Sequence, residues 1–233
     1  MPKPTFFRLP AARRDRLVHE AIVEFGNRAF SEASLSQMAL RADIPKGSFY
    51  QYFEDKLDLY RWLLTEEVPR QKRDYLGETA PEDDFWQRLE VVIERGIGFL
   101  VEHPHLARLS AAAADPSAIA EVRGLHRSIC EAGYRELHAL VAHGLAQGAV
   151  SPVLDAGFAT RLIQSVIGPG LTDVILTELG ADLHEVLASD ALRQRLDGPR
   201  RAALAADAVR FLRGGLAPAA QTPFEQRSTH EQR

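Results

Sequence analysis

Helical periodicity runs through almost the whole of this chain. Apolar residues recur three and four positions apart, as Leu17, Ala21, Ile22 and Phe25 do, and we find no segment that alternates apolar and polar residues between hairpin turns. Residues at this spacing make one apolar face of a helix. The sequence therefore predicts an all-α fold.

The composition is that of an ordinary globular protein. The chain has 233 residues, of which 45% are hydrophobic and 26% are charged, enough to bury a core in one or two domains. Its one cysteine, Cys130, excludes an intramolecular disulfide and any multi-cysteine metal site within the chain. The formal net charge of −4 argues against general polyanion binding.

The sequence gives no sign of targeting or membrane insertion. No unbroken apolar run approaches the roughly 18–20 residues that span a bilayer. The first basic residues are not followed by the apolar stretch of a signal peptide. We therefore expect a soluble cytoplasmic protein with no membrane partner.

Interruptions in the periodicity divide the chain into three parts. Residues 1–60 are expected to form a small unit of three helices, and a connecting helix leads from it into a larger helical body over residues 61–217. The body contains four long amphipathic stretches that begin or break near prolines: about 83–103, 116–147, 155–179 and 199–217. Residues 218–233 are mostly polar and are predicted to be a disordered tail.

Two short helices at about 35–42 and 46–53, separated by a tight turn, have helix-turn-helix spacing. Ser34 is placed to cap the first helix, and Phe49 and Phe53 are predicted to fix the second helix in the core. Six residues are left available on the other faces of the second helix, away from the core: Lys46, Gly47, Ser48, Tyr50, Gln51 and Tyr52. A cation, a hydroxyl, phenols and an amide suit phosphates and base edges.

This region resembles the DNA-binding domain of the TetR family. The resemblance covers about residues 12–62 and rests on Phe25, residues 34–39, the run Lys-Gly-Ser-Phe-Tyr-Gln-Tyr-Phe at 46–53, and residues 55–60. It implies a homodimeric transcriptional regulator, usually a repressor, whose helical C-terminal domain binds a small-molecule effector. Such a regulator binds a palindromic double-stranded DNA operator and is released from it by the effector.

The resemblance also implies roles for individual residues. Ser34 and Ser36 would contact phosphates at the start of the first helix of the motif. Bases or nearby backbone would be contacted by Lys46, Gly47, Ser48 and Gln51. The DNA backbone would be bound mainly by Tyr50, Tyr52 and Lys56.

Two residues depart from the family pattern in the turn. Asp43 stands where glycine is common, and aspartate tolerates left-handed backbone better than most residues. Pro45 stands where a capping serine or threonine is common, so a cap hydrogen bond is lost, although proline suits a helix start. The turn is expected to survive both changes.

The sequence of the body, residues 61–217, indicates less about function than the N-terminal motif does. The resemblance implies that the stretches at 155–179 and 199–217 form a four-helix dimer interface with a second copy, and Gly168-Pro169-Gly170 is expected to kink the first of them. Mixed aromatic, apolar and polar side chains suit a mid-sized hydrophobic effector. The candidate ligand-binding residues are Phe99, His103, His126, Cys130 and Tyr134.

Other functional classes have less support. His126 and Cys130 lie four residues apart and could share a face, but two side chains are too few for a metal site. No P-loop or other nucleotide or nucleophile motif is present. We expect no metal, no cofactor and no catalytic site. Two alternatives remain: an all-helical carrier or enzyme whose helix-turn-helix no longer binds DNA, and an activator of the same fold.

Overall fold

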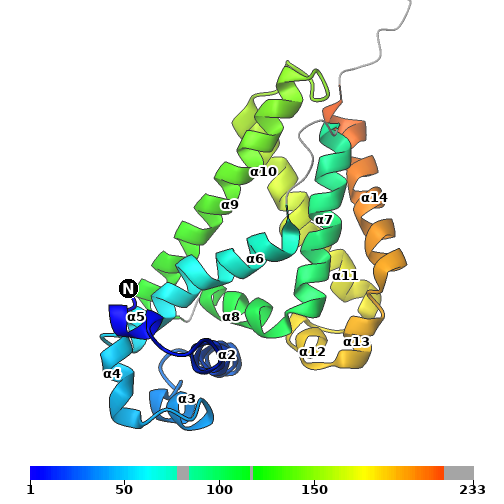
Figure 1. Ribbon diagram of the computed structural model, residues 1–233. Coiled ribbons are helices and arrows are strands. Elements are labelled where there is room, and N and C mark those ends of the chain that lie inside the picture. Colours follow the sequence, from blue (N-terminus) through cyan, green and yellow to red (C-terminus); the bar gives the residue numbers. More distant parts are fainter. Residues whose placement is uncertain (78–83, 116–117, 218–233) are drawn as a thin grey trace, which may run out of the picture.

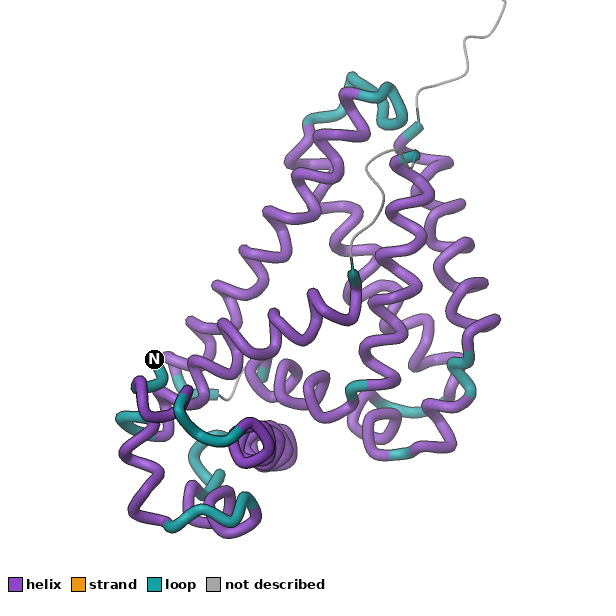
Figure 2. The backbone as a smooth tube through the Cα atoms, in the orientation of Figure 1, coloured by secondary structure: helices purple, strands orange, loops and turns teal. Residues whose placement is uncertain are grey.

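The computed structural model describes residues 1–77, 84–115 and 118–217, and for Lys46 it describes the backbone only. All regular structure in this part of the chain is helical, which confirms the predicted all-α fold (Figures 1 and 2). The expected disordered tail at 218–233 lies outside the described residues.

The helices follow one another along the chain with short connections. Their bounds are α1 Pro4–Phe7, α2 Ala11–Asn27, α3 Leu35–Arg41, the 3₁₀ turn η1 Lys46–Ser48, α4 Phe49–Tyr52, α5 Lys56–Trp62, the π turn η2 Leu63–Glu67, α6 Val68–Leu76, α7 Phe85–Glu102, α8 Pro104–Ala114, α9 Ala120–Ala146, α10 Ala156–Ser165, the π turn η3 Val166–Gly170, α11 Leu171–Leu179, α12 Leu183–Ala188, α13 Asp190–Gln194 and α14 Gly198–Leu216. The four predicted stretches of the body correspond to α7, α9, α10 to α11, and α14.

The structure adds to the sequence predictions or differs from them at several helices. The second helix of the motif is only a 3₁₀ turn followed by one turn of α-helix. A further helix, α8, starts directly at Pro104, where proline needs no amide partner. The short helices α1, α12 and α13 were not predicted. The interruption at Gly168-Pro169-Gly170 is a π turn within an otherwise continuous helix.

Aspartate side chains mark where several helices begin. A carboxylate oxygen accepts the N–H three residues ahead at Asp55 (2.7 Å to Asp58 N), Asp155 (2.9 Å to Phe158 N) and Asp197 (2.9 Å to Arg200 N). Each bond satisfies an amide that the first helical turn leaves without a partner.

The buried side chains form two clusters. The first joins residues of α2 to α6, such as Phe25 and Phe53, to residues of α8 and α9, such as Leu109 and Val122. The second lies among α7, α10, α11, α12 and α14, with Phe85, Ile163 and Val209 among its members. The N-terminal helices therefore share a core with part of the body.

The helices α2 and α8 approach each other closely. A Cβ atom at Gly26 of α2 would lie 3.1 Å from the Cβ of Arg108 and 3.2 Å from the carbonyl oxygen of His105. Glycine at this position lets the two backbones meet. In Figure 1, α6 starts beside α5 and runs toward α7, so one helical segment, α5–η2–α6, links the motif to the body.

Candidate nucleic-acid interface

The turn between α3 and α4 is built as the sequence predicted. Asp43 has φ of 56° and is the one described non-glycine residue with left-handed backbone. On either side of it, Ala42 N–H donates to Met38 O (2.9 Å) and Ile44 N–H donates to Ala39 O (2.9 Å). Asp43 thus adopts the conformation for which glycine is usually selected.

Buried aromatic rings hold the inner face of α4. Phe49 and Phe53 are almost completely buried and stacked, with ring centroids 5.6 Å apart. On the other side, Tyr50 is 57% exposed, Gln51 is exposed, and a Cβ at Gly47 would meet nothing within 4 Å. The predicted burial of both phenylalanines is confirmed, and the outer side of α4 is an open polar surface.

Tyr52 and Lys56, two residues predicted to contact DNA, make contacts within the protein. Tyr52 is only 9% exposed and packs edge-on against Phe6, with ring centroids 6.5 Å apart. The ammonium of Lys56 donates to the carbonyls of Ser31 (3.1 Å) and Ala33 (3.0 Å) and lies 4.8 Å from the ring centroid of Phe30. Lys56 therefore holds the loop that precedes α3.

The remaining predicted contacts lie along the start of α3 and η1. Ser34 is the N-cap of α3, as predicted, and its hydroxyl accepts Gln37 N–H at 3.4 Å. Ser36 and Ser48 are half-buried, and the structure describes no side chain for Lys46. DNA contact at each of these positions stays a prediction.

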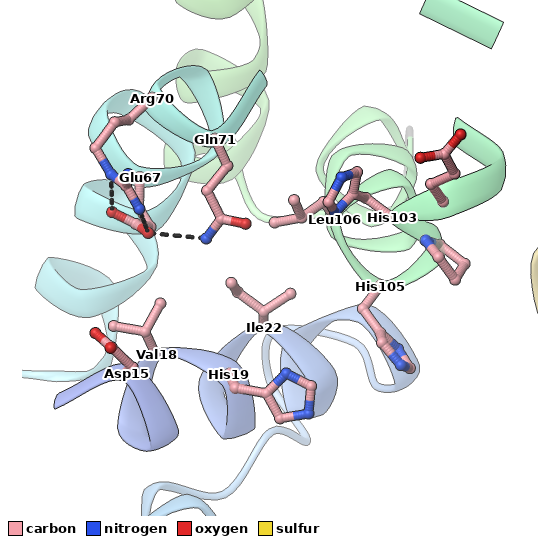
Figure 3. A pocket seen from close by; sticks show the side chains of 12 residues that line it. Asp15, Val18, His19, Ile22, Glu67, Arg70, Gln71, His103, His105 and Leu106 are labelled. Atoms are coloured by element: carbon pink, nitrogen blue, oxygen red, sulfur yellow. Dashed lines mark hydrogen bonds and ion pairs between the residues drawn. The ribbon is translucent and has the colours of Figure 1, made fainter. Parts of the chain in front are cut away.

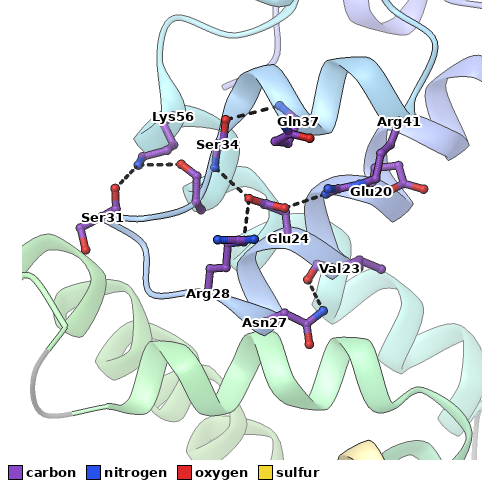
Figure 4. Close-up of polar contacts among 11 residues, drawn as sticks. Glu20, Val23, Glu24, Asn27, Arg28, Ser31, Ser34, Gln37, Arg41 and Lys56 are labelled. Carbon is purple, nitrogen blue, oxygen red and sulfur yellow. Dashed lines mark hydrogen bonds and ion pairs between the residues drawn. The ribbon is translucent and has the colours of Figure 1, made fainter.

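A buried carboxylate fixes the start of α3 (Figure 4). Glu24 of α2 accepts Ser34 N–H at 3.0 Å on one oxygen and Arg41 Nη2 at 2.7 Å on the other, and Arg28 Nε lies 3.4 Å away. Arg41 also donates to Glu20 at 2.6 Å. Both ends of α3 are thus tied to α2, although the sequence reasoning assigned Glu24 no role.

The surroundings of Glu24 favour its charged form. Burial alone would raise its pKa, but the hydrogen bonds from Arg41 and Ser34 N–H and the charges of Arg41 and Arg28 lower the pKa below its ordinary value of 4.5. A carboxylate with a lowered pKa contributes stability above about pH 4.5 that is lost as the pH falls through the lowered value.

We expect Glu24→Gln to destabilise the protein by about 1–3 kcal/mol at pH 7, because the amide leaves a buried donor facing Arg41. The difference from wild type should shrink as the pH falls from about 4.5 through the lowered pKa, because the wild-type carboxylate becomes protonated over that range. Urea denaturation at pH 7 and at pH 4 measures both effects. The matched control is Glu20→Gln, which loses a more exposed contact to the same arginine. Equal stability of the two variants at pH 7 would contradict this assignment.

A pocket of about 330 Å³ lies where α2 meets α6 and the α7–α8 corner (Figure 3). Its lining residues are Asp15, Val18, His19, Ile22, Glu67, Arg70, Gln71, Glu102, His103, Pro104, His105 and Leu106. On one wall, Glu67 accepts two hydrogen bonds from Arg70 (2.6 and 3.0 Å) and one from Gln71 (2.8 Å). The pocket thus spans the motif and the body.

Imidazole rings line the opposite wall of this pocket. His19 of α2 and His105 of α8 meet edge to face, with centroids 5.9 Å apart. Burial lowers the pKa of His105, and the nearby charges of Arg108, His19 and Arg193 lower it further. The contact between α2 and α8 is therefore made by a neutral His105 at pH 7.

The five candidate ligand residues lie in three places. Phe99 and His103 pack together at the end of α7, with centroids 5.0 Å apart, and His103 also lines the pocket. On α9, the sulfur of Cys130 lies 3.6 Å from Nε2 of His126. Tyr134 instead stacks on His138, with the guanidinium of Arg161 4.0 Å from its ring centroid. Their shared role as a ligand site stays a prediction.

A metal site finds no support in the described ranges. Within residues 1–77, 84–115 and 118–217, no group of three or more His, Cys, Asp or Glu side chains is arranged to hold a metal ion. Cys130 is exposed.

Comparison with known families identifies the N-terminal motif. The family model described as "Bacterial regulatory proteins, tetR family" matches residues 17–62. This range covers most of α2, all of α3 and α4, and α5. No curated protein matches the chain.

Solved structures extend the similarity over the body. A TetR family transcriptional regulator from Chloroflexus aurantiacus is 29% identical, with a TM-score of 0.69 over 93% of this chain and 98% of that one. The fatty acid degradation regulator FadR from Bacillus halodurans is 19% identical, with a TM-score of 0.66 over 89% and 97%. FadR from Bacillus subtilis in complex with stearoyl-CoA is 19% identical, with a TM-score of 0.59 over 78% and 96%.

Proposed function

The chain carries the DNA-binding domain of the TetR family on a body with the fold of that family's transcriptional regulators, and from this premise we propose that it is a homodimeric repressor released from a palindromic operator by a small-molecule effector. The observation that carries the proposal is the outer surface of α4, where Tyr50 and Gln51 are exposed above a core of buried aromatic rings. The protein is proposed to act in the cytoplasm, without enzymatic activity.

Two such surfaces in one dimer could read two half-sites. A symmetric dimer presents the same helix twice, and half-site centres about 34–36 Å apart let both copies enter successive major grooves. Lys46, Gly47, Ser48 and Gln51 are assigned to bases or nearby backbone in each half-site. Ser34, Ser36, Tyr50, Tyr52 and Lys56 are assigned to the phosphate backbone.

Exposed apolar side chains on the last long helices support dimerisation. Phe158, Leu162, Val174 and Phe211 are all exposed, on α10, α11 and α14. Large apolar side chains in contact with water favour association with a partner surface. We propose that a second copy of the chain covers this surface.

The same region contains a helix with the length and apolar composition of a membrane span. Among the described residues, Ala156–Leu179 is a helix long and apolar enough to cross a bilayer by length and composition, and 17% of its most apolar window is buried. This segment is not an unbroken apolar run, because Arg161 and Asp173 interrupt it, and the sequence analysis therefore did not predict a membrane span. Those charges and the π turn at Val166–Gly170 favour a protein partner over lipid.

We propose that the effector acts through the junction between α2 and the body. A ligand that changes how α8 packs on α2 would change the separation of the two motifs in the dimer. The pocket between α2, α6 and the α7–α8 corner lies at this junction, and His103 belongs both to its lining and to the candidate ligand residues. Stearoyl-CoA, the ligand named for the Bacillus subtilis FadR structure, is the first compound to try as an effector.

Fluorescence anisotropy tests the proposal. The purified protein is titrated onto duplex DNA from upstream of its own gene and onto a scrambled duplex, at two salt concentrations. We expect selective binding that weakens with salt, because phosphate contacts release counterions. Failure to select any preferred site, even from random DNA, would sink the regulator proposal and favour a carrier or an enzyme.

Variants of α4 separate the assigned roles. We expect Tyr50→Ala to weaken binding to every duplex by about tenfold, and Gln51→Ala to lower the preference for the operator by about 1–3 kcal/mol. Gln87→Ala, at an exposed position on α7, is the matched control and should bind as wild type. All three variants should remain dimeric by size-exclusion chromatography. Unchanged DNA affinity in both α4 variants would remove these residues from the interface.

A further inference from the structure

The recognition helix α4 is too short to be stable alone. It consists of Phe49–Tyr52 after a 3₁₀ turn, and a helix of this length gains little from its own hydrogen bonds. The carbonyls of its last turn also need donors from elsewhere. Phe49 O is satisfied by Phe53 N–H at 3.1 Å, which leaves the carbonyls of Tyr50, Gln51 and Tyr52.

Donors from the N-terminal segment meet all three carbonyls. Lys3 donates twice, from its ammonium to Tyr50 O at 2.8 Å and from its backbone N–H to Tyr52 O at 2.8 Å. The hydroxyl of Thr5 donates to Gln51 O. The ammonium of Lys3 also lies at the C-terminal end of the helix, where a positive charge is favoured.

A buried ring fixes this segment to the motif. Phe6 is almost completely buried, with its centroid 5.1 Å from the rings of both Phe53 and Trp62. Pro4 opens α1 at a position where proline is tolerated. Thus α1 is an anchored element, and it lies outside residues 17–62, the range that the family model matches.

We propose that Lys3, Thr5 and Phe6 form a positioning arm that caps the recognition helix from outside the family's motif. Two of the capped carbonyls belong to Tyr50 and Gln51, the residues whose side chains are assigned to DNA. Without the arm, the last turn of α4 would fray and both side chains would lose their fixed directions. The arm thereby supports sequence selectivity without contacting a base, which rests on the proposed DNA-binding function.

Thr5→Val tests the arm, because it removes one donor from an exposed residue and keeps the shape of the side chain. Thr5→Ser restores the hydroxyl. Thr65→Val is the matched control, since it removes a threonine hydroxyl that donates to a helix carbonyl, Arg61 O at 3.0 Å, away from α4. Amide hydrogen exchange of peptides covering residues 46–56 is measured without DNA, and anisotropy is measured on operator and scrambled duplexes at several salt concentrations.

We expect Thr5→Val to speed exchange in this peptide and to lower the preference for the operator by about three- to tenfold. The salt dependence should stay unchanged, and Thr5→Ser should behave as wild type. Exchange and selectivity equal to those of Thr65→Val would overturn the proposal. Lys3→Met is the second variant, and a reduced salt dependence with unchanged exchange would mean that Lys3 binds phosphate directly, against the arm's positioning role.

The two levels of the proposal fail in different ways. If wild type selects no duplex, the DNA-binding function fails, whereas faster exchange in Thr5→Val would still establish the cap. If wild type selects an operator and exchange is unchanged by Thr5→Val, the arm alone is wrong.

Discussion

Replacing both Phe158 and Phe211 with glutamate is expected to leave a folded monomer that binds the operator at least a hundredfold more weakly than wild type. Both rings are largely in water, 56% and 72% exposed, so their loss should cost the monomer little stability. In a dimer, burial of two like charges would oppose association. Two linked motifs gain a factor of about 10²–10⁴ in avidity over one motif. Analytical ultracentrifugation measures the dimer, and anisotropy on the operator duplex measures the affinity.

Val153→Glu is the control for the added charge, because Val153 is exposed in the turn between α9 and α10. It should remain a dimer and bind DNA as wild type. A double variant that stays dimeric would move the interface away from α10 and α14. Flotation of wild type with lipid vesicles would instead assign the apolar segment Ala156–Leu179 to a membrane.

The Phe53→Ala variant is expected to lose about 3–5 kcal/mol of stability and most of its DNA binding at 25 °C. The Phe53 ring is fully buried and contacts the rings of Phe6, Phe49 and Trp62 at centroid distances of 5.1–5.8 Å. Its removal leaves a cavity that the surrounding rings fill only in part. A loss of this size is a large share of the total stability of a typical domain, about 5–15 kcal/mol. Urea denaturation followed by far-UV circular dichroism measures the change.

Phe7→Ala removes the same ring from an exposed neighbouring position and should change the stability by less than about 0.5 kcal/mol. The contrast with Tyr50→Ala is also informative, since that variant should lose DNA affinity while its unfolding curve stays in place. A Phe53→Ala protein as stable as wild type would mean that the aromatic cluster does not hold α4.

Local signals in the sequence were enough for much of the fold. The capping roles of Ser34 and Asp55 depend on a short side chain and an amide three residues ahead, so the sequence shows both partners. The spacing of four residues between Phe49 and Phe53 predicts that both are buried, and both are, although Phe53 directly follows the last residue of α4. The left-handed backbone at Asp43 could be predicted because aspartate is one of the few residues that tolerate this conformation.

Contacts between distant residues could not be read in the same way. Nothing near Lys56 in the sequence indicates that its ammonium binds the carbonyls of Ser31 and Ala33, since this depends on how the loop folds over α5. The bond from Glu24 to Ser34 N–H likewise needs the packing of α2 on α3. One further signal is local: Pro4 and Thr5 followed by two phenylalanines are typical of a short helix with an apolar anchor.

The candidate ligand residues on α9 show what helical periodicity cannot predict. His126, Cys130 and Tyr134 recur every four residues, so periodicity gave them one helix face. A helix as long as α9, Ala120–Ala146, passes several neighbours along its length, and one face meets different surroundings at each turn. Periodicity identifies which side chains point the same way, and only the packing of α9 decides what each one meets.

The buried cluster shared by α2 and α8 bears on attempts to exchange parts between regulators. Phe25 and Phe53 belong to the same cluster as Leu109 and Val122, so part of the core of the N-terminal helices is supplied by α8 and α9. A chimera that moved residues 1–62 onto a foreign body would expose apolar surface unless the new body supplied a matching α8. Retargeting this scaffold to a new DNA sequence should therefore change only the outer faces of α3 and α4 and keep their inner faces with the body on which they are built.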